Sequence, residues 1–375
     1  MSDPRNHALA DQLVSYSLGI QPGELLYLEV KGRSSLDLAE EVISSTTRAG
    51  GIPVLIYHDE RTMRSFWEEA GERQMREYSA AHLDLMKRAA AFLSIRGSDN
   101  PFDLQGLPED KQKQMGQLFT TPVHMEERLN HTRWCVLRYP NEAMAVMARR
   151  SQRPFVDFFY KVCCLDYARL SKAMDPLLAM LAKGDKVHIE GPGTDLRFSI
   201  RGIGAVKCDG HRNIPDGEVY TAPVRDSVNG RISYNTGSLQ QGVYYDGIQL
   251  VFEKGRIVDC SCRVGDAEAL RRIFGKDEGA AYVGEFAFGL NPYILDPLED
   301  ILFDEKIAGS IHFTPGNAYA AADNGNRSEL HWDLVLIQTP ERGGGSISLD
   351  GRLIRKDGVF VADELLALNP DRLSE

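Results

Sequence analysis

The feature that most constrains this fold is an alternation of apolar runs and amphipathic stretches in the N-terminal third of the chain. Residues 25–30 and 52–57 are largely apolar runs typical of buried strands, and residues 36–47 between them place apolar side chains at helical spacing. Further strand-like runs occupy residues 90–95 and 133–138. Strands that alternate with helices across short loops predict a mostly parallel sheet covered by helices.

The sequence changes character near residue 183. Residues 141–182 indicate further helices, whereas the later chain shows alternating patterns and turn signals such as Pro215-Asp216-Gly217. We therefore predict an α/β fold with two domains. An N-terminal α/β domain with a mostly parallel sheet covers residues 1–183, and a sheet-rich, largely antiparallel domain covers residues 184–375.

Composition indicates which partners the protein can bind and which cellular compartment suits it. The 375 residues carry a formal net charge of −11, whereas a nucleic-acid binder usually presents a basic face. The N-terminus lacks the basic start and apolar segment of a signal peptide, and no apolar run is long enough to cross a bilayer. The six cysteines form no C-x-x-C pair. We expect a cytoplasmic protein with no nucleic-acid or membrane partner.

Common motifs for phosphate binding and for serine catalysis are missing from the sequence. No G-x-G-x-x-G follows the first predicted strand, and neither G-x-x-x-x-G-K-[ST] nor G-x-S-x-G occurs. The glycine run at residues 343–345 leads into a strand-like pattern and not into a helix. Nucleotide binding and a serine hydrolase are therefore poor interpretations.

Histidines and carboxylates of the second domain are the remaining candidates for chemistry. His331 and Asp333 are separated by one residue, so a strand would place both side chains on one face, where they can grip one cation. Glu285 lies in an apolar strand, where a carboxylate is costly to bury unless it is paired or bound to a cation. His312 precedes a turn and Glu218 follows one, so a core histidine and a solvated glutamate are the plainer interpretations of these two.

Together these segments supply two histidines and three carboxylates. Mixed imidazole and carboxylate ligands are typical of sites for Zn²⁺, Co²⁺ or Mn²⁺. They differ from the thiolate ligands of a structural zinc site. A carboxylate-rich set can also hold two ions about 3.5–4 Å apart, as in two-metal hydrolases. The second domain is therefore the candidate metal-binding domain.

Four motifs in order resemble the M29 metallopeptidases, the group of aminopeptidase T and of aminopeptidase S/PepS. They are P-D-G-E-V-Y-T-A-P at residues 215–223, G-E-F-A-F-G-L-N-P at residues 284–292, G-S-I-H-F-T-P-G-N-A-Y at residues 309–319, and H-W-D at residues 331–333. Residues 16–24 and 191–196 also resemble the openings of the two domains in that family. The resemblance covers nearly the whole chain.

The resemblance implies a dimeric aminopeptidase that removes N-terminal residues from peptides with two divalent metal ions, typically zinc or cobalt. It also implies that Tyr319 lies at the site, where its hydroxyl is a candidate donor to the oxyanion. Asp333 or Glu218 is expected to bridge the ions, and Glu285 is the candidate general base. The implied metal ligands are Glu218, Glu285, His312, His331 and Asp333.

One position departs from the family pattern. Many members carry a further site glutamate five residues before the first histidine, where this chain has Ile307. The nearest acid is Glu305, two residues earlier, so its part in the site is left open.

Two other functions are compatible with the sequence. Two histidines and one carboxylate are also the ligands of a non-haem Fe(II) oxygenase, and a dihydroxypyridine ring-cleaving dioxygenase is similar in fold to the M29 enzymes. That function would leave Glu218 and Glu285 without a purpose. A non-catalytic peptide-binding member is the second alternative, against which the complete set of candidate ligands argues.

Overall fold

The computed structural model describes residues 3–100, 103–240 and 243–374, and the chain forms two compact units. The first unit runs to Leu165 and adds Gly210–Ile214, while the second comprises Asp166–Asp209 and the chain from Pro215 onward. The division that we predicted between residues 183 and 184 therefore differs from the grouping of contacts, because the helix over Tyr167–Lys183 packs against strands of the second unit. The outer ends of the predicted domains, residues 1 and 375, lie outside the described residues.

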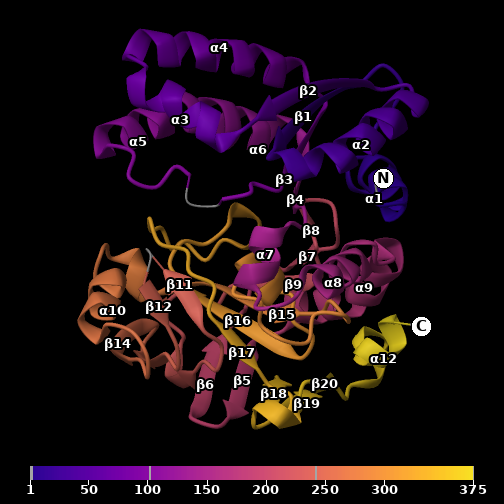
Figure 1. Cartoon of the computed structure of the whole chain (residues 1–375). Helices are drawn as coiled ribbons and strands as arrows, with labels where there is room; N and C mark the ends of the chain where they lie inside the picture. The colour runs from indigo at the N-terminus through magenta and orange to yellow at the C-terminus, as the bar shows by residue number, and fades with distance from the viewer. Residues whose placement is uncertain (1–2, 101–102, 241–242, 375) are drawn as a thin grey trace. The chain divides into compact units, whose positions relative to one another are not determined.

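The first unit is built on a parallel sheet, shown in indigo and purple in Figure 1. Its strand order is β2-β1-β3-β4-β8, and all pairings are parallel. The four strands predicted from apolar runs are present, and β1 and β3 are buried along almost their whole length. The strands are β1 (Leu25–Lys31), β2 (Ile52–His58), β3 (Ala91–Arg96), β4 (Arg133–Arg138) and β8 (Asn213–Ile214).

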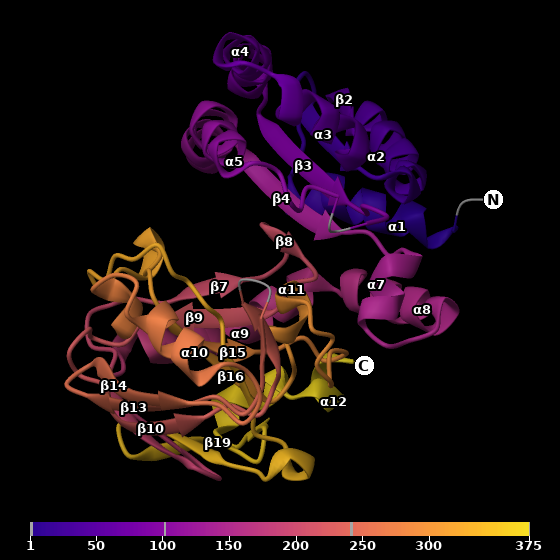
Figure 2. The ribbon, with the colours of Figure 1, turned by 60° about the vertical axis from the view of Figure 1, so that its left-hand side comes forward.

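Helices cover both faces of this sheet. Helices α1 and α2 pack together on one side, and α4 and α5 lie on the other, as Figure 2 shows. Burial on both faces explains why the central strands β1 and β3 are largely apolar instead of alternating, whereas the edge strand β2 is partly exposed. The helices are α1 (Arg5–Gln12), η1 (Leu13–Ser17), η2 (Arg33–Ser35), α2 (Leu36–Arg48), α3 (Glu60–Glu69), α4 (Glu72–Arg88), α5 (Glu109–Met115), η3 (Gly116–Arg128), α6 (Leu129–His131), α7 (Glu142–Met147) and α8 (Gln152–Cys163).

The second unit is dominated by antiparallel strands, as predicted. One sheet has the order β14-β13-β10-β6-β5-β18-β19-β20, another has the order β17-β16-β15-β9-β7, and β11 and β12 form a hairpin. The strands are β5 (Lys186–Gly191), β6 (Thr194–Ser199), β7 (Val206–Cys208), β9 (Glu218–Thr221), β10 (Asn229–Ser233), β11 (Ser238–Gln240), β12 (Val243–Tyr245), β13 (Gln249–Glu253), β14 (Arg256–Ser261), β15 (Val283–Gly289), β16 (Ser310–Pro315), β17 (Val335–Ile337), β18 (Ser346–Leu349), β19 (Arg352–Lys356) and β20 (Val359–Phe360).

The two larger sheets of this unit pack through aromatic side chains. Phe198 of β6 lies with its ring centroid 5.1 Å from those of Phe286 and Phe313, and Phe252 of β13 lies 5.9 Å from Phe313. Alternation along β15 and β16 therefore sends one set of side chains into this core and the other set to the opposite face. The helices of the unit are α9 (Tyr167–Lys183), α10 (Ala267–Phe274), η4 (Gly279–Ala281), α11 (Ile301–Asp304), η5 (Ala320–Ala322), η6 (Pro340–Arg342), η7 (Asp363–Leu368) and α12 (Pro370–Leu373).

The strand that we predicted through His331 and Asp333 begins later than expected. Strand β17 starts at Val335, and His331 contributes only an isolated bridge to Gly316. A hydrogen bond holds Leu330 instead, in which its carbonyl accepts from the backbone amide of Asn317. The strand-based reason for placing His331 and Asp333 on one face was therefore wrong.

Candidate metal centre

Three neighbouring strands of the second unit bring most of the candidate ligands to one face. Glu285 on β15 pairs in register with Thr314 on β16, and Ala287 pairs with His312. Strand β9 begins with Glu218, which pairs with Gly289 at the end of β15. Because Phe286 and Phe313 fill the aromatic core, alternation turns Glu285 and His312 to the opposite face. A β-bulge between Val283 and Glu285 sets this register locally.

The segment before β17 adds His331 and Asp333. Asp333 accepts a hydrogen bond from the Thr314 hydroxyl, with 2.8 Å between Oγ1 and Oδ1. His331 Nδ1 lies 2.8 Å from the Asn317 carbonyl oxygen and must be the donor, so Nε2 is the ring nitrogen that faces the other ligands. These two bonds bring His331 and Asp333 together without a strand.

The five predicted metal ligands form one cluster. His312 Nε2 lies 2.9 Å from Glu285 Oε1 and 3.4 Å from Glu218 Oε2. His331 Nε2 lies 3.3 Å from Asp333 Oδ1 and 3.6 Å from Glu285 Oε2. Two triads result, each with candidate ligand atoms within 4.8 Å of one another. Glu285 belongs to both triads, with one carboxylate oxygen facing each histidine.

Unsatisfied polar atoms show that this cluster suits divalent cations. Glu218, Glu285 and His312 are 6%, 3% and 1% exposed, so their polar groups are largely removed from water. Within the described part of the chain, Oε2 of Glu218 and Oε2 of Glu285 are buried without a hydrogen-bond partner. Burying carboxylate oxygens in this way is costly unless a cation or a proton compensates them. Carboxylates and neutral imidazoles are also the donors that such cations take.

The pKa values of the cluster depend on several carboxylates that lie beside the same two histidines. Burial lowers the pKa of His312, but its hydrogen bond to Glu285 and the nearby Glu218 outweigh burial and raise it to about 9. Burial alone raises the pKa of Asp333, but His331 and the Thr314 hydroxyl outweigh burial and bring this pKa well below the ordinary value. Burial raises the pKa of Glu285 despite its bond to His312. The imidazolium protons occupy the place that metal cations would take.

Tyr319 lies at the edge of the cluster. Its ring centroid is 4.6 Å from that of His331 and 6.1 Å from that of Tyr220. Its ring remains partly exposed, at 48% of the residue surface. Desolvation of the hydroxyl, with Asp333 and Glu285 nearby, raises its pKa, so the phenol stays protonated and can donate a hydrogen bond.

Glu305, which the sequence left open, lies in the electrostatic reach of the cluster. The pKa of Glu305 is raised to about 8. Burial is the main cause, Glu218 and Asp333 also raise the pKa, and Lys306 lowers it. Its side chain is 14% exposed. Helix α11 ends at Asp304, and the turn that follows brings Glu305 to the same region as the ligands.

Lys306 is a site residue that the sequence reasoning missed. Its side chain is fully buried, and Nζ lies 3.0 Å from Glu218 Oε1, 3.9 Å from Asp216 Oδ1 and in close contact with Glu305. Burial lowers the pKa of Lys306, but the surrounding carboxylates raise it well above its usual value. In the sequence, the run Asp304-Glu305-Lys306 resembles a solvated helix end, and no local pattern signals a buried lysine.

Comparison with known proteins identifies the family. The sequence model of the M29 family, described as thermophilic metalloproteases, matches residues 3–358. The chain belongs to the M29 metalloproteases. It is 28% identical to aminopeptidase T of Thermus thermophilus over 92% of this chain and 93% of that protein. The solved structure of wild-type AmpT from Thermus thermophilus superposes with a TM-score of 0.76 at 23% identity, covering 96% of this chain and 99% of that one.

These comparisons confirm the resemblance, the mixed α/β fold and the metal-dependent aminopeptidase that the M29 motifs predicted. A 2,5-dihydroxypyridine dioxygenase from Pseudomonas putida has a TM-score of 0.59 at 14% identity, covering 96% of this chain and 98% of that one. That likeness confirms the related fold alone and gives the oxygenase alternative no further support. No helix among the described residues is both long and apolar enough to span a bilayer.

Proposed function

We propose that this M29 member removes N-terminal residues from peptides at a dinuclear metal centre formed by Glu218, Glu285, His312, His331 and Asp333. The observation that carries the proposal is the position of Glu285 in two ligand triads, with one carboxylate oxygen toward each histidine. A carboxylate placed in this way suits the bridge between two ions. Glu285, in place of Asp333 or Glu218, would therefore be the ligand shared by the two ions when both are bound.

The remaining ligands divide between the two positions. Glu218 and His312 complete one triad, and His331 and Asp333 complete the other. When bound, a pair of Zn²⁺, Co²⁺ or Mn²⁺ ions lowers the pKa of water and polarises a peptide carbonyl. Free cysteines and the absence of thiolates from both triads are consistent with a reducing, cytoplasmic location. The homodimer implied by the family resemblance stays a proposal.

Glu305 is the general base in this proposal. A base works best when its pKa lies near the working pH, and burial raises the pKa of Glu305 to about 8. With Glu285 shared between the triads, Glu305, which pairs with Lys306, would take a proton from water and return it to the leaving amine, in place of the Glu285 base expected from the sequence. Lys306 keeps Glu305 in place through their ion pair. Tyr319 donates a hydrogen bond toward the oxyanion that forms on the substrate.

The test is peptide hydrolysis by protein stripped of metal and reloaded separately with Zn²⁺, Co²⁺, Mn²⁺ or Fe²⁺. Release of free amino acids from a dipeptide panel is followed for the wild type, Glu285→Gln and Glu253→Gln, the last being an exposed glutamate on β13 of the same unit. We expect metal-dependent release that falls by about 100-fold or more in Glu285→Gln, because both triads lose a charged ligand. Glu253→Gln should match the wild type.

Other outcomes would reject the proposal. Release that does not depend on added metal, or equal rates in Glu285→Gln and the wild type, would remove Glu285 from the centre. Peptide binding without turnover under every metal would favour the non-catalytic alternative. Oxygen uptake with Fe²⁺ and a dihydroxylated aromatic ring would favour the oxygenase.

A further inference from the structure

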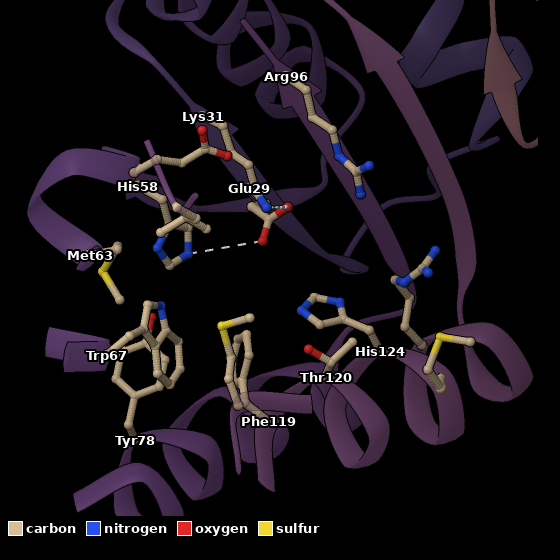
Figure 3. Close-up of a pocket in the computed structure, with 15 residues that line it drawn as sticks. Glu29, Lys31, His58, Met63, Trp67, Tyr78, Arg96, Phe119, Thr120 and His124 are labelled. Carbon is tan, nitrogen blue, oxygen red and sulfur yellow. Dashed lines mark ion pairs between the residues drawn. The ribbon is translucent and has the colours of Figure 1, made fainter. Parts of the chain in front are cut away.

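The first unit contains a cavity that the proposed peptidase reaction does not use. Its volume is about 340 Å³, within the range typical of small-molecule sites. All of its lining residues belong to the first unit, from the ends of β1, β2 and β3 and from helices α3, α4, α5 and η3. Figure 3 shows the side chains that point into it.

The topology of the sheet predicts a ligand site at this position. The chain runs from β1 to its neighbour β2 and then returns to β3 on the other side of β1, so the direction of strand addition reverses between β1 and β3. In open parallel sheets, ligands bind at the carboxyl ends of the strands next to such a reversal. Lys31 and Arg96 are the last residues of β1 and β3 and lie in register, and His58 ends β2 beside Lys31. All three line the cavity.

The cavity has a charged side and an aromatic side. Glu29, Lys31 and Arg96 lie on the sheet side in Figure 3, whereas Trp67 and Phe119 face them from the helices. Trp67 is 4% exposed and packs with its ring centroid 5.6 Å from that of Phe119. Two neighbouring aromatic rings offer a ligand a large apolar contact.

The charged side of the cavity has more cations, Lys31, Arg96 and Arg128, than carboxylates, Glu29 and Glu60. Glu29 is satisfied within the protein, since it accepts from the Ser94 hydroxyl at 2.6 Å and lies 3.7 Å from Lys31 Nζ. Among the described residues, Nε and Nη1 of Arg128 are buried without a hydrogen-bond partner, whereas Arg96 Nε donates to the Ser94 hydroxyl at 3.1 Å. The Glu29 carboxylate acts on both guanidiniums, and it opposes the lowering of their pKa by burial. The Arg128 guanidinium packs over the Trp134 ring, 4.7 Å from its centroid. Two buried donor atoms of one guanidinium without an acceptor are an incomplete arrangement.

We propose that this cavity binds a small organic acid, with its carboxylate held by Arg96 and Arg128 and its aromatic or branched apolar body packed against Trp67 and Phe119. A planar guanidinium binds a carboxylate through two parallel hydrogen bonds. None of the lining residues is a proposed metal ligand, since every one of them belongs to the first unit.

Binding is tested on the metal-loaded full chain by calorimetric titration with 3-phenylpropionate. Its neutral amide, 3-phenylpropionamide, has the same shape without the charge, and 2-phenylethyl phosphate carries the other anionic group. We expect saturable binding of the carboxylate and affinity at least about 10-fold weaker for the amide, because a charge-assisted bidentate contact is lost. Quenching of Trp67 fluorescence should accompany binding of the carboxylate.

Variants locate the binding. Arg128→Met and Arg96→Met should each weaken 3-phenylpropionate binding by about 10-fold or more, and Arg128→Lys, which keeps the charge, should weaken it less. Arg88→Met, at an exposed position on α4, is the matched control and should bind as the wild type does. Thermal melting of each variant shows whether it folds, and Arg96→Met serves if Arg128→Met does not.

Several outcomes would overturn the proposal. They are equal affinity for the acid and the amide, preference for the phosphate ester, no saturable binding of any probe, and unchanged affinity in both folded arginine variants. The last result would place the carboxylate on the metal centre instead.

Discussion

Lys306 Nζ lies 3.0 Å from Glu218 Oε1, and this lysine is completely buried beside a residue of the metal centre. Asp216 and Glu305 also face the same ammonium group. The lysine therefore supplies a fixed positive charge to a region that holds several carboxylates. It would complement metal ions bound at the proposed centre from the side of Glu218.

Replacing Lys306 with methionine should destabilise the metal-free protein by about 3–5 kcal/mol, because buried carboxylates lose their cation. The loss should be smaller in the zinc-loaded protein, since bound cations neutralise part of the same charge. Urea unfolding with and without Zn²⁺ measures both values. Lys186→Met, at an exposed position on β5, is the control and should change neither. Equal destabilisation with and without metal would separate Lys306 from the centre.

Thr314→Val should weaken metal binding by about 10–100-fold, because the hydroxyl that orients Asp333 is removed without a large change in shape. The matched control is Thr221→Val on β9. Thr221 is also buried, but its hydroxyl donates to the Gly204 carbonyl, and it pairs in register with Phe286 of the aromatic core. Competition with a fluorescent zinc chelator gives both affinities. Similar losses in the two variants would show a general effect of strand packing and not an effect on Asp333.

The sheet of the first unit could be predicted from the sequence because β1 and β3 are buried on both faces, and because the edge strand β2 is an apolar run although it is partly exposed. Apolar runs at residues 25–30, 52–57, 90–95 and 133–138 therefore coincide with β1 to β4, and each end differs by one residue or none. The same logic identified Glu285, since a carboxylate inside an apolar strand needs a partner. Every residue of β15, Glu285 included, is buried.

Other parts of the site depended on contacts that no local pattern contains. Glu218 follows a turn and resembled a solvated residue, yet it is buried because β9 lies between β15 and β7. His331 and Asp333 meet although they precede β17, because Asn317 and Thr314 hold them from a distant segment. Lys306 is buried only because Asp216 and Glu218 reach it from another segment. Tertiary neighbours decided these three cases.

His82 should make the first unit sensitive to mild acid. It packs against the Tyr78 and Phe119 rings and contacts the Tyr27 hydroxyl. Burial, and then the neighbouring His58, lower its pKa to about 4 from 6.5. Since the unfolded chain then binds more protons below pH 6.5, stability falls as the pH drops from 6.5 to 4, and the effect ends below the folded pKa.

The measurement is the urea midpoint of metal-free protein at neutral and acidic pH, followed by tryptophan fluorescence. His82→Gln should recover about 1–2 kcal/mol of the stability lost at about pH 4, after allowance for partial solvent screening. His7→Gln, at an exposed position on α1, should lose as much as the wild type. An identical pH dependence in His82→Gln and the wild type would assign the sensitivity to other groups.

Gly284→Ala should damage the metal centre through the backbone. An added Cβ would lie 2.2 Å from the Asn317 carbonyl oxygen and 2.4 Å from that of Gly316, distances at which one segment must move. The Asn317 oxygen also accepts the hydrogen bond from His331 Nδ1, and Glu285 is the next residue along β15. The substitution therefore shifts a ligand from each side of the cluster.

We expect Gly284→Ala to lower the free energy of unfolding by about 1–3 kcal/mol through overpacking and to weaken zinc binding by about 10-fold or more. Gly116→Ala is the control, because nothing lies within 4 Å of its added Cβ and it lies at the start of helix η3. Alanine is the better helix former, so that variant should be unchanged or slightly more stable. Unfolding with urea and zinc competition are run on both. If Gly284→Ala loses stability but binds zinc as the wild type does, the Asn317 carbonyl does not control the orientation of His331, and Asp333 alone must position that imidazole.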